Sequence, residues 1–469
     1  MIQKAAVNAL PAFFTTYYTT QFGQADHKKQ EQVIEKYLRQ LKSPLEVTRQ
    51  GHLLALGSLP PFMLHGKLKP VLAGIIQATQ ITQKESKWAE ARRDAIKALT
   101  RVCMTVGVER DGDPTRALCV SNIPQIYEAF LTAMKDYSLD SRGDVGAWVR
   151  EATMSGLEEI TSVVVQKSPD LFQPSLCEHV MKCLIQQSCE KIDRTRSYAG
   201  TIFINLLYHS PDIPYIPHLE KLHTLFPEKE IGLINWAAPG DTFPRFTKLL
   251  DCDKYRYSVL LGLTVSVGGL TESLVKHSST QLQSYLRNMC KDVDELTKIT
   301  STLTEIFHDY HKVDRVSIPM LKMLDQLISI GCFDSLLEHE SHPFPLDVYS
   351  FVKSEIQKCG DPQKLLCGAD VLCGLLQCPG EVRRKCLISL SIYLCHRFPR
   401  IRKLTANKLY EVFVTYDDIA PVENLDEIMT ILSETLWDND IEDIKPIRNT
   451  LCNLLDIPVP TTVKKAAAS

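Results

Sequence analysis

The stretch from Asp140 to Val165 reads DSRGDVGAWVREATMSGLEEITSVVV. Its apolar residues recur every three or four positions, which is the spacing of one face of an α-helix. These residues are Val145, Val149, Ala152, Gly156, Ile160 and Val164. Asp144 comes just before this face, where a carboxylate can accept hydrogen bonds from the free backbone N–H groups of the first turn. Arg150 follows six residues later.

An Asp in a turn followed by Val-Arg on the next helix resembles the second helix of a HEAT repeat. In such repeats the Asp and the Arg typically form a ladder that ties neighbouring repeats together. The resemblance implies an all-α, HEAT/armadillo-like helical-repeat solenoid in which Asp144 and Arg150 form a rung of this structural ladder. The alternative is an ordinary amphipathic helix with a surface arginine.

Similar helices recur along the chain, and their spacing favours the repeat interpretation. Arginines occupy comparable positions at Arg49, Arg92, Arg150 and Arg196, with separations of 43, 58 and 46 residues. A HEAT unit has about 40–47 residues, so the first and last intervals fit one unit each. The longest interval fits one unit with an inserted loop.

The length limits the possible architectures, and the net charge limits the possible partners. The chain has 469 residues, whereas a single compact core usually stops growing near about 250–300 residues. It is therefore multi-domain or a solenoid. The formal net charge is -3, which provides no basic footprint for nucleic acid. We expect no nucleic-acid partner.

Proline usage predicts the domain organisation. Six prolines fall between residues 209 and 245, and prolines inside helices remove hydrogen bonds and introduce clashes. We expect HEAT-like repeats over 1–208, an irregular connection over 209–245, a second helical array over 246–457 and a flexible tail over 458–469. In the second array, Tyr255–Val275 and Val313–Ile330 are predicted as helices, the latter kinked or restarted at Pro319. No segment shows convincing strand alternation.

Cysteine usage predicts a reducing compartment. The count of fifteen is odd, so at least one thiol lies outside any internal disulfide. Many of the cysteines fall inside apolar helical runs, as buried reduced thiols of a cytosolic protein do. The most apolar run, Val259–Leu270, is shorter than the roughly 20 residues of a membrane helix. We expect a cytoplasmic protein without a transmembrane segment.

Motifs that carry chemistry are lacking in the sequence. It contains no Gly-rich phosphate loop and no Gly-x-Ser-x-Gly elbow. His339-Glu340-Ser341-His342 is one residue short of a zinc-protease motif and precedes a proline. His308 and His311 share a helical face without an evident third ligand. We therefore expect no catalytic residues, no metal site and no cofactor.

The cysteine-rich region is the remaining candidate for chemistry. Six cysteines lie between Cys359 and Cys395, spaced by 8, 6, 5, 8 and 9 residues. Structural zinc sites prefer pairs about two to four residues apart. The spacing and the helical setting favour core thiols, and the alternative is an enzyme that uses this thiol-rich region.

Several stretches together resemble the tubulin-folding cofactor D family. The signature stretch is 140–150, DSRGDVGAWVR. The others, in the same order as in the family, are 190–194 (EKIDR), 255–262 (YRYSVLLG), 268–273 (GGLTES), 331–334 (GCFD) and 395–399 (CHRFP). The similarity runs from near residue 5 to near residue 457. Family members are much longer, so the chain is expected to correspond to their C-terminal portion.

The resemblance implies a function in assembling α/β-tubulin heterodimers. Family members hold β-tubulin, work with cofactors C and E and an Arf-like small GTPase, and can dismantle heterodimers. With cofactors C and E they stimulate GTP hydrolysis by tubulin. A cytoplasmic, cytoskeleton-associated location, including the centrosome and cell junctions, follows from the same resemblance. The alternative function is a general HEAT-repeat adaptor for another protein complex.

Overall fold

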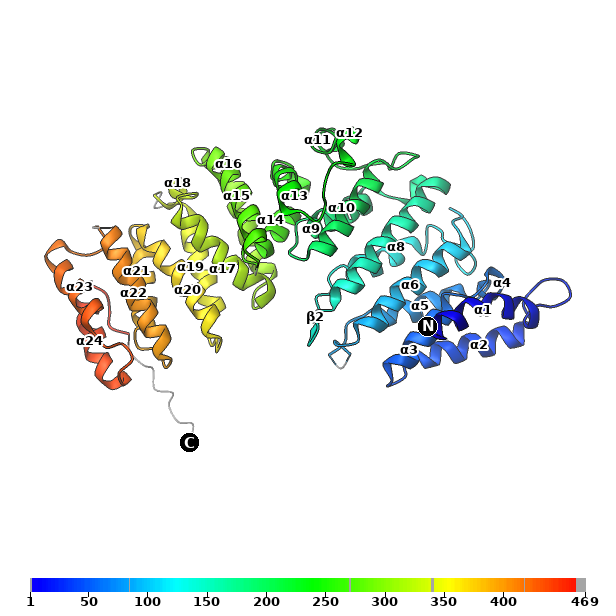
Figure 1. Cartoon of the computed structure of the whole chain (residues 1–469), viewed down its shortest axis with the longest axis horizontal. Helices are drawn as coiled ribbons and strands as arrows, with labels where there is room; N and C mark the ends of the chain where they lie inside the picture. Colours follow the sequence, from blue (N-terminus) through cyan, green and yellow to red (C-terminus); the bar gives the residue numbers. More distant parts are fainter. Residues whose placement is uncertain (1, 84, 270, 339–340, 417, 461–469) are drawn as a thin grey trace. The chain divides into compact units, whose positions relative to one another are not determined.

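The computed structural model describes residues 2–83, 85–269, 271–338, 341–416 and 418–460. Within these ranges the chain consists mainly of α-helices (Figure 1). It divides into two compact units, Met1–Phe246 and Thr247–Ser469.

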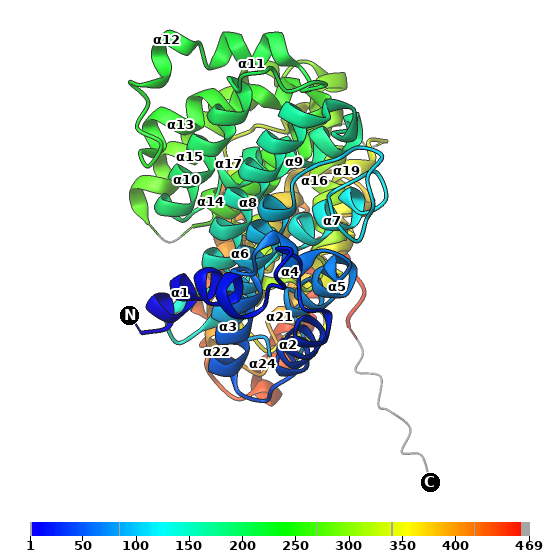
Figure 2. The same ribbon diagram turned by 90° about the vertical axis from the view of Figure 1, so that its right-hand side faces the viewer.

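The first unit is built from two layers of helices. One layer contains α2 (His27–Gln40), α5 (Leu68–Ala78), α7 (Ile123–Ala133) and α9 (Pro174–Gln187). The other contains α3 (Glu46–Leu56), α6 (Ala89–Val106), α8 (Gly146–Lys167) and α10 (Asp193–Leu207). Consecutive members of each layer pack against one another, and the two layers stand side by side in Figure 2. Each helix of one layer alternates along the chain with a helix of the other, as expected for helical repeats.

Further elements complete the first unit. Helix α1 packs on α3, and α4 packs on α6. The elements are α1 (Ile2–Tyr17), α4 (Pro61–Leu64), the strands β1 (Leu139–Asp140) and β2 (Gly143–Asp144), η1 (Pro169–Leu171), α11 (Leu219–Leu225), α12 (Glu228–Ile231) and α13 (Pro239–Phe246).

The second unit repeats the two-layer plan. Helices α14 (Asp253–Val267), α17 (Asp314–Ser329), α20 (Pro362–Gly374) and α22 (Pro399–Thr415) pack consecutively in one layer. Helices α16 (Val293–Asp309), α19 (Pro343–Ile356), α21 (Glu381–Tyr393) and α24 (Ile441–Leu454) pack consecutively in the other. The remaining elements are η2 (Thr247–Asp251), α15 (Glu272–Met289), α18 (Asp334–Leu337), η3 (Leu375–Gln377), η4 (Val422–Asn424) and α23 (Leu425–Glu434).

This architecture confirms the predicted all-α helical-repeat solenoid. The described residues also contain one short antiparallel hairpin, in which Leu139 pairs with Asp144 and Asp140 pairs with Gly143, and two isolated β-bridges, Thr19–Ala25 and Val108–Leu118. Two residues per strand are too few to show alternation in a sequence, which explains why no strand is predicted there.

The buried face of α8 is broader than the sequence pattern indicates. The predicted apolar residues are buried except Ala152, which is half-buried. Met154 and Leu157, which the predicted stripe omits, are fully buried. Helix α8 packs against α6, α7 and α10, so neighbours cover more than one stripe of its surface.

The Pro-rich segment 209–245 is ordered by aromatic packing and holds most of α11 to α13. The ring of Phe226 lies 6.1 Å from Trp236 and 5.1 Å from Phe246. The boundary between the two compact units falls after Phe246. The predicted divisions at 208, 245 and 457 stay predictions, and residues 461–469 of the predicted tail lie outside the described residues.

The predicted helix Tyr255–Val275 is interrupted, which corrects the sequence interpretation. Helix α14 ends at Val267, and α15 begins at Glu272. A Cβ atom at Gly268 would lie only 2.3 Å from the Cα of Pro319. The chain therefore turns where its backbone lies against α17. That helix runs through Pro319 from Asp314 to Ser329 instead of restarting there.

Candidate functional site

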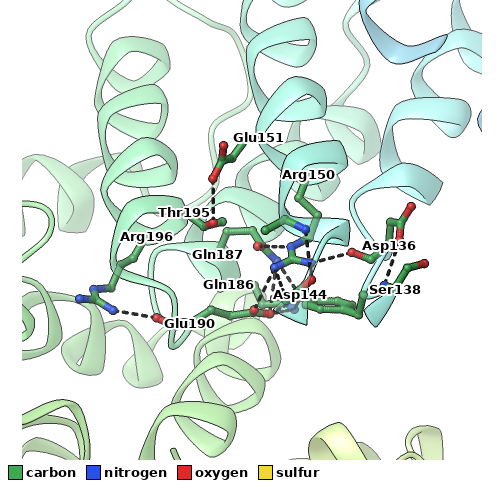
Figure 3. Close-up of polar contacts among 12 residues, drawn as sticks. Asp136, Ser138, Asp144, Arg150, Glu151, Gln186, Gln187, Glu190, Thr195 and Arg196 are labelled. Carbon is green, nitrogen blue, oxygen red and sulfur yellow. Dashed lines mark hydrogen bonds and ion pairs between the residues drawn. The ribbon is translucent and has the colours of Figure 1, made fainter. Parts of the chain in front are cut away.

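Arg150 is the centre of a buried polar cluster in the first unit (Figure 3). Its side chain is fully buried. Its Nη2 lies 3.0 Å from Asp144 Oδ2, its Nη1 donates to the Asp136 carbonyl oxygen at 2.6 Å, and its Nε donates to Gln187 Oε1 at 2.9 Å. The guanidinium also stacks over the Tyr137 ring, 4.0 Å from its centre. Most of its hydrogen-bonding capacity is therefore used.

A second acid balances this buried charge. Glu190 Oε2 lies 4.0 Å from Arg150 Nη2, and its other oxygen accepts a hydrogen bond from the Tyr137 hydroxyl. Burial alone lowers the pKa of Arg150. The interactions with Tyr137, Glu190 and Asp144 outweigh that effect and raise this pKa above its ordinary value. The cluster thus holds a permanent cation between two carboxylates.

The hairpin and its glycines place Asp144 for this contact. Gly143 has a φ of +101°, a conformation that favours glycine. Asp144 then accepts a hydrogen bond from the backbone N–H of Ala147 at 3.1 Å, as the sequence predicts for the first turn of this helix. One carboxylate therefore caps α8 and pairs with Arg150 on the same helix.

Gly146 is required by a close backbone approach. A Cβ atom there would lie 2.4 Å from the Asp136 carbonyl oxygen, which is the same oxygen that accepts from Arg150. The GDVGAWVR sequence thus combines the cap, the close contact and the ion pair within one turn and helix.

We expect Gly146→Ala to lower the free energy of unfolding by about 1–3 kcal/mol, because the added methyl overpacks a backbone contact. The matched control is Gly51→Ala in α3, where a Cβ would meet no atom within 4 Å. This control should raise the stability by about 0.5–1 kcal/mol through helix propensity. Chemical denaturation of both variants checks the pair, and a similar effect at the two positions would contradict the close-contact account.

Other arginines in the first unit make equivalent bridges. Arg92 donates to the carbonyl oxygens of Glu85 and Ser86 in the connection before α6. It also pairs with Asp136, at 2.6 Å, in the connection after α7. Arg196 donates to the carbonyl oxygens of Glu190 and Ala237. Each of these side chains therefore contacts two connections between helices that follow one another in the repeat. The structure brings Asp144 and Arg150 together within such a row of contacts.

In the second unit a lysine, and not an arginine, makes one of these bridges. Lys364 on α20 pairs with Glu355 at the end of α19 and with Asp314 at the start of α17, the latter at 2.7 Å. Glu355 also accepts from the backbone N–H of Lys312 at 3.0 Å. Burial alone raises the pKa of Glu355, but these hydrogen bonds, led by that from Lys364, lower it. A lysine thus bridges successive turns in this unit.

A half-buried acidic pair lies elsewhere in the second unit. Burial raises the pKa of the Asp370 carboxyl on α20 to about 6, and Asp325 on α17 adds to this effect. Lys408 acts in the opposite direction, and Glu411 acts in the same direction as Asp325. The carboxylate form of Asp370 is therefore disfavoured by folding.

The pH dependence follows from the sign of this shift. The unfolded chain loses the Asp370 proton at a pKa of about 3.9, whereas the folded protein keeps this proton up to its higher pKa. Between these two pKa values the free energy of unfolding therefore falls as the pH rises. Asp370→Asn should stabilise the second unit at pH 7.5, by about 1 kcal/mol after solvent screening, and have little effect near pH 4. Urea unfolding at the two pH values checks this, and an equal effect at both would contradict it.

The cysteine-rich region and the histidines are the candidates that the sequence offers for a metal site. No group of three or more His, Cys, Asp or Glu side chains there is placed to hold a metal ion. Burial raises the pKa of Cys378 to about 12, which keeps this thiol protonated and a poor nucleophile. His308 is largely exposed, whereas the Nε2 of His311 forms a hydrogen bond with Ser354 Oγ at 2.8 Å.

His339 and Glu340 of the shortened zinc-protease motif lie outside the described residues, while the Nδ1 of His342 accepts from the backbone N–H of Phe344 at the start of α19. Among the described helices, none has the length and apolarity of a membrane span.

Sequence reasoning missed most partners of Arg150. Asp136, Tyr137, Gln187 and Glu190 lie on other turns and helices, up to 40 residues away. Glu190 is the first residue of EKIDR, one of the stretches that resemble the family. This resemblance was the only feature of the sequence that drew attention to a distant partner of Arg150. The pattern alone assigned no role to it.

The sequence of the chain matches known proteins. Residues 178–364 match the family model described as tubulin folding cofactor D C terminal. Tubulin-specific chaperone D of Dictyostelium discoideum is 23% identical over 503 aligned residues, which cover 96% of this chain and 33% of that protein. The chain thus spans about a third of the length of this relative.

A crystal structure of an engineered protein is matched over 97% of this chain and 96% of that one, at 10% identity and a TM-score of 0.27. This score carries no argument about the fold. The family model and the curated relative point to the same group as the ordered stretches of the sequence. The chain is similar to the tubulin-folding cofactor D family over residues 178–364 and to tubulin-specific chaperone D over most of its length.

Proposed function

We propose that this chain is a tubulin-binding segment of a tubulin-folding chaperone. The observation that carries the proposal is its similarity, over 96% of its length, to a tubulin-specific chaperone. In this proposal the chain holds β-tubulin and takes part in the assembly and disassembly of α/β-tubulin heterodimers. Its partners are β-tubulin, cofactors C and E and an Arf-like small GTPase.

The solenoid architecture supports this kind of binding. Repeat proteins present long surfaces made of many neighbouring helices, and such surfaces hold large folded partners without a deep pocket. The rungs around Arg92, Arg150 and Arg196 connect successive turns of the first unit. They support a preorganised surface, which lowers the ordering cost of binding.

The proposed contribution to GTP hydrolysis is conformational. The chain supplies no catalytic residue, and the hydrolytic site belongs to tubulin. Together with cofactors C and E, the bound solenoid shifts tubulin toward a hydrolysis-competent state. Such a shift requires tighter binding to one tubulin conformation than to the other. A cytoplasmic location with the microtubule cytoskeleton, extending to the centrosome and cell junctions, belongs to the same proposal.

Reconstitution tests this proposal. Phosphate release is measured for tubulin with GTP and cofactors C and E, with and without the full chain, and for the chain with GTP alone. We expect faster release only when tubulin and the chain are both present. GTP hydrolysis by the chain alone would contradict the non-enzymatic function.

Size-exclusion chromatography of the same mixtures separates the chaperone from a general adaptor. The chaperone proposal expects the chain to co-elute with tubulin or with a tubulin-folding cofactor. A folded chain that elutes apart from all of them would contradict the proposal.

A further inference from the structure

Helices α21 to α24 of the second unit carry their charges in two separate blocks. Residues 382–408 contain eight Lys and Arg residues and no Asp or Glu, whereas residues 409–444 contain eleven Asp and Glu residues and no Lys, Arg or His. A surface that serves only solubility usually intersperses the two signs. This complete separation indicates a surface that meets a partner of complementary charge.

The cationic block is exposed on one face of α22. Arg400, Lys403, Tyr410 and Val414 recur at helical spacing, and all four are exposed. Other cations of the block are paired, as Lys408 is with Glu411. Among the described residues, however, no carboxylate lies within ion-pair distance of Arg400 or Lys403. The exposed cations of this face are therefore available to a partner.

The acidic block is exposed on the neighbouring helix. Helix α23 packs against α22 (Figure 1). Its exposed acids are Asp426, Glu427 and Glu434, and none of them has an ion partner in the part of the chain that the structure describes. Two adjacent helices thus present opposite and uncompensated charges.

Apolar side chains accompany both blocks. Val414 on α22 is 64% exposed, Val422 before α23 is 79% exposed, and Leu436 after α23 is 67% exposed. Exposed ion pairs contribute little by themselves, whereas protein interfaces combine an apolar centre with a polar rim. These side chains supply apolar area that a partner would remove from water.

A second copy of this chain has the surface that fits. Its α23 carries acids for the cations of α22, and its α22 carries cations for the acids of α23. Because α22 and α23 are neighbours, a two-fold axis between them satisfies both contacts at once, as in an isologous dimer. A partner that is only acidic or only basic would leave one of the two blocks without a counter-charge.

We infer that the α22–α23 face of this chain binds the same face of a second copy in a salt-sensitive dimer. The face consists of Arg400, Lys403, Tyr410, Val414, Asp426 and Glu427. The inference goes beyond the proposed function, because it concerns association of the chain with itself. A failure to bind tubulin would leave it intact.

Sedimentation velocity of the full chain over a concentration series tests the inference. We expect a reversible monomer–dimer equilibrium at low ionic strength that shifts toward the monomer as salt is added. Arg400→Glu/Lys403→Glu should weaken the dimer at least about tenfold, because like charges then face α23 of the other copy. Asp426→Lys/Glu427→Lys should weaken it by a similar factor for the converse reason. Mixing the two variants should restore a dimer, since each then meets opposite charges on the other.

The matched control is Lys276→Glu/Lys291→Glu, which makes the same change in charge at exposed positions on α15 and just after it. This control should dimerise like the unaltered chain, and circular dichroism verifies that every variant keeps its helices. A chain that stays monomeric at low salt, a dimer that both face variants leave unchanged, or a mixture of them that stays monomeric would overturn the inference. A monomeric chain that binds oligolysine through Asp426 and Glu427 would overturn it in favour of a basic partner protein.

Discussion

Replacing Arg150 by alanine is expected to destabilise the first unit by about 3–5 kcal/mol, the range for removing one partner of a buried ion pair. The substitution leaves Asp144 and Glu190 without their shared cation, and it also removes the donors to Gln187 and to the Asp136 carbonyl oxygen. Urea denaturation measures the loss. Amide hydrogen exchange should show it concentrated in α8, α9 and the hairpin.

The matched control is Arg194→Ala. Arg194 also pairs with a glutamate on α8, but its side chain is 74% exposed. A pair whose arginine is solvent-exposed contributes about 0–1 kcal/mol, and Glu151 keeps its hydrogen bond from Thr195, so this variant should unfold almost like the unaltered chain. Equal losses for the two variants would contradict the role of burial, and an unchanged Arg150→Ala variant would contradict the ladder itself.

Lys364→Ala is expected to have a comparable effect on the second unit, again about 3–5 kcal/mol. Glu355 is fully buried and would lose its principal ion partner. The exposed control is Lys385→Ala, whose pair with Glu381 lies one helical turn away on the surface of α21. Thermal unfolding followed by circular dichroism compares the two.

A double replacement separates charge compensation from packing. Lys364→Met/Glu355→Leu removes both buried charges at similar volume, and it should be less destabilising than Lys364→Ala alone. If the double variant is the less stable of the two, the cost of an unpaired Glu355 is not the cause.

The helix pattern was predictable because it is local. The spacing of Val149, Gly156 and Ile160 depends only on the periodicity of one helix, and the recurrence of Arg49, Arg92, Arg150 and Arg196 indicated the repeat. The pairing of Asp144 with Arg150 also lies within one turn and helix. These features required no knowledge of how helices pack.

The features of the fold and of the polar cluster that were not predicted depend on contacts between residues far apart in the sequence. Gln187 and Glu190 reach Arg150 only after α9 packs against α7 and α10, and no local pattern encodes that contact. The close approach of Gly268 to Pro319, where α14 ends, likewise joins residues that are distant in the sequence. Lys364 replaces arginine as a bridging cation, so a search for Val-Arg pairs passes over it.

The most direct test of the central claim is the equilibrium binding of the full chain to purified α/β-tubulin. The chain is immobilised, tubulin is titrated over it by biolayer interferometry, and actin serves as a control protein of another class. Circular dichroism of the same preparation verifies its helical fold. We predict saturable binding to tubulin and none to actin. A folded chain that binds neither tubulin nor any tubulin-folding cofactor would contradict the account.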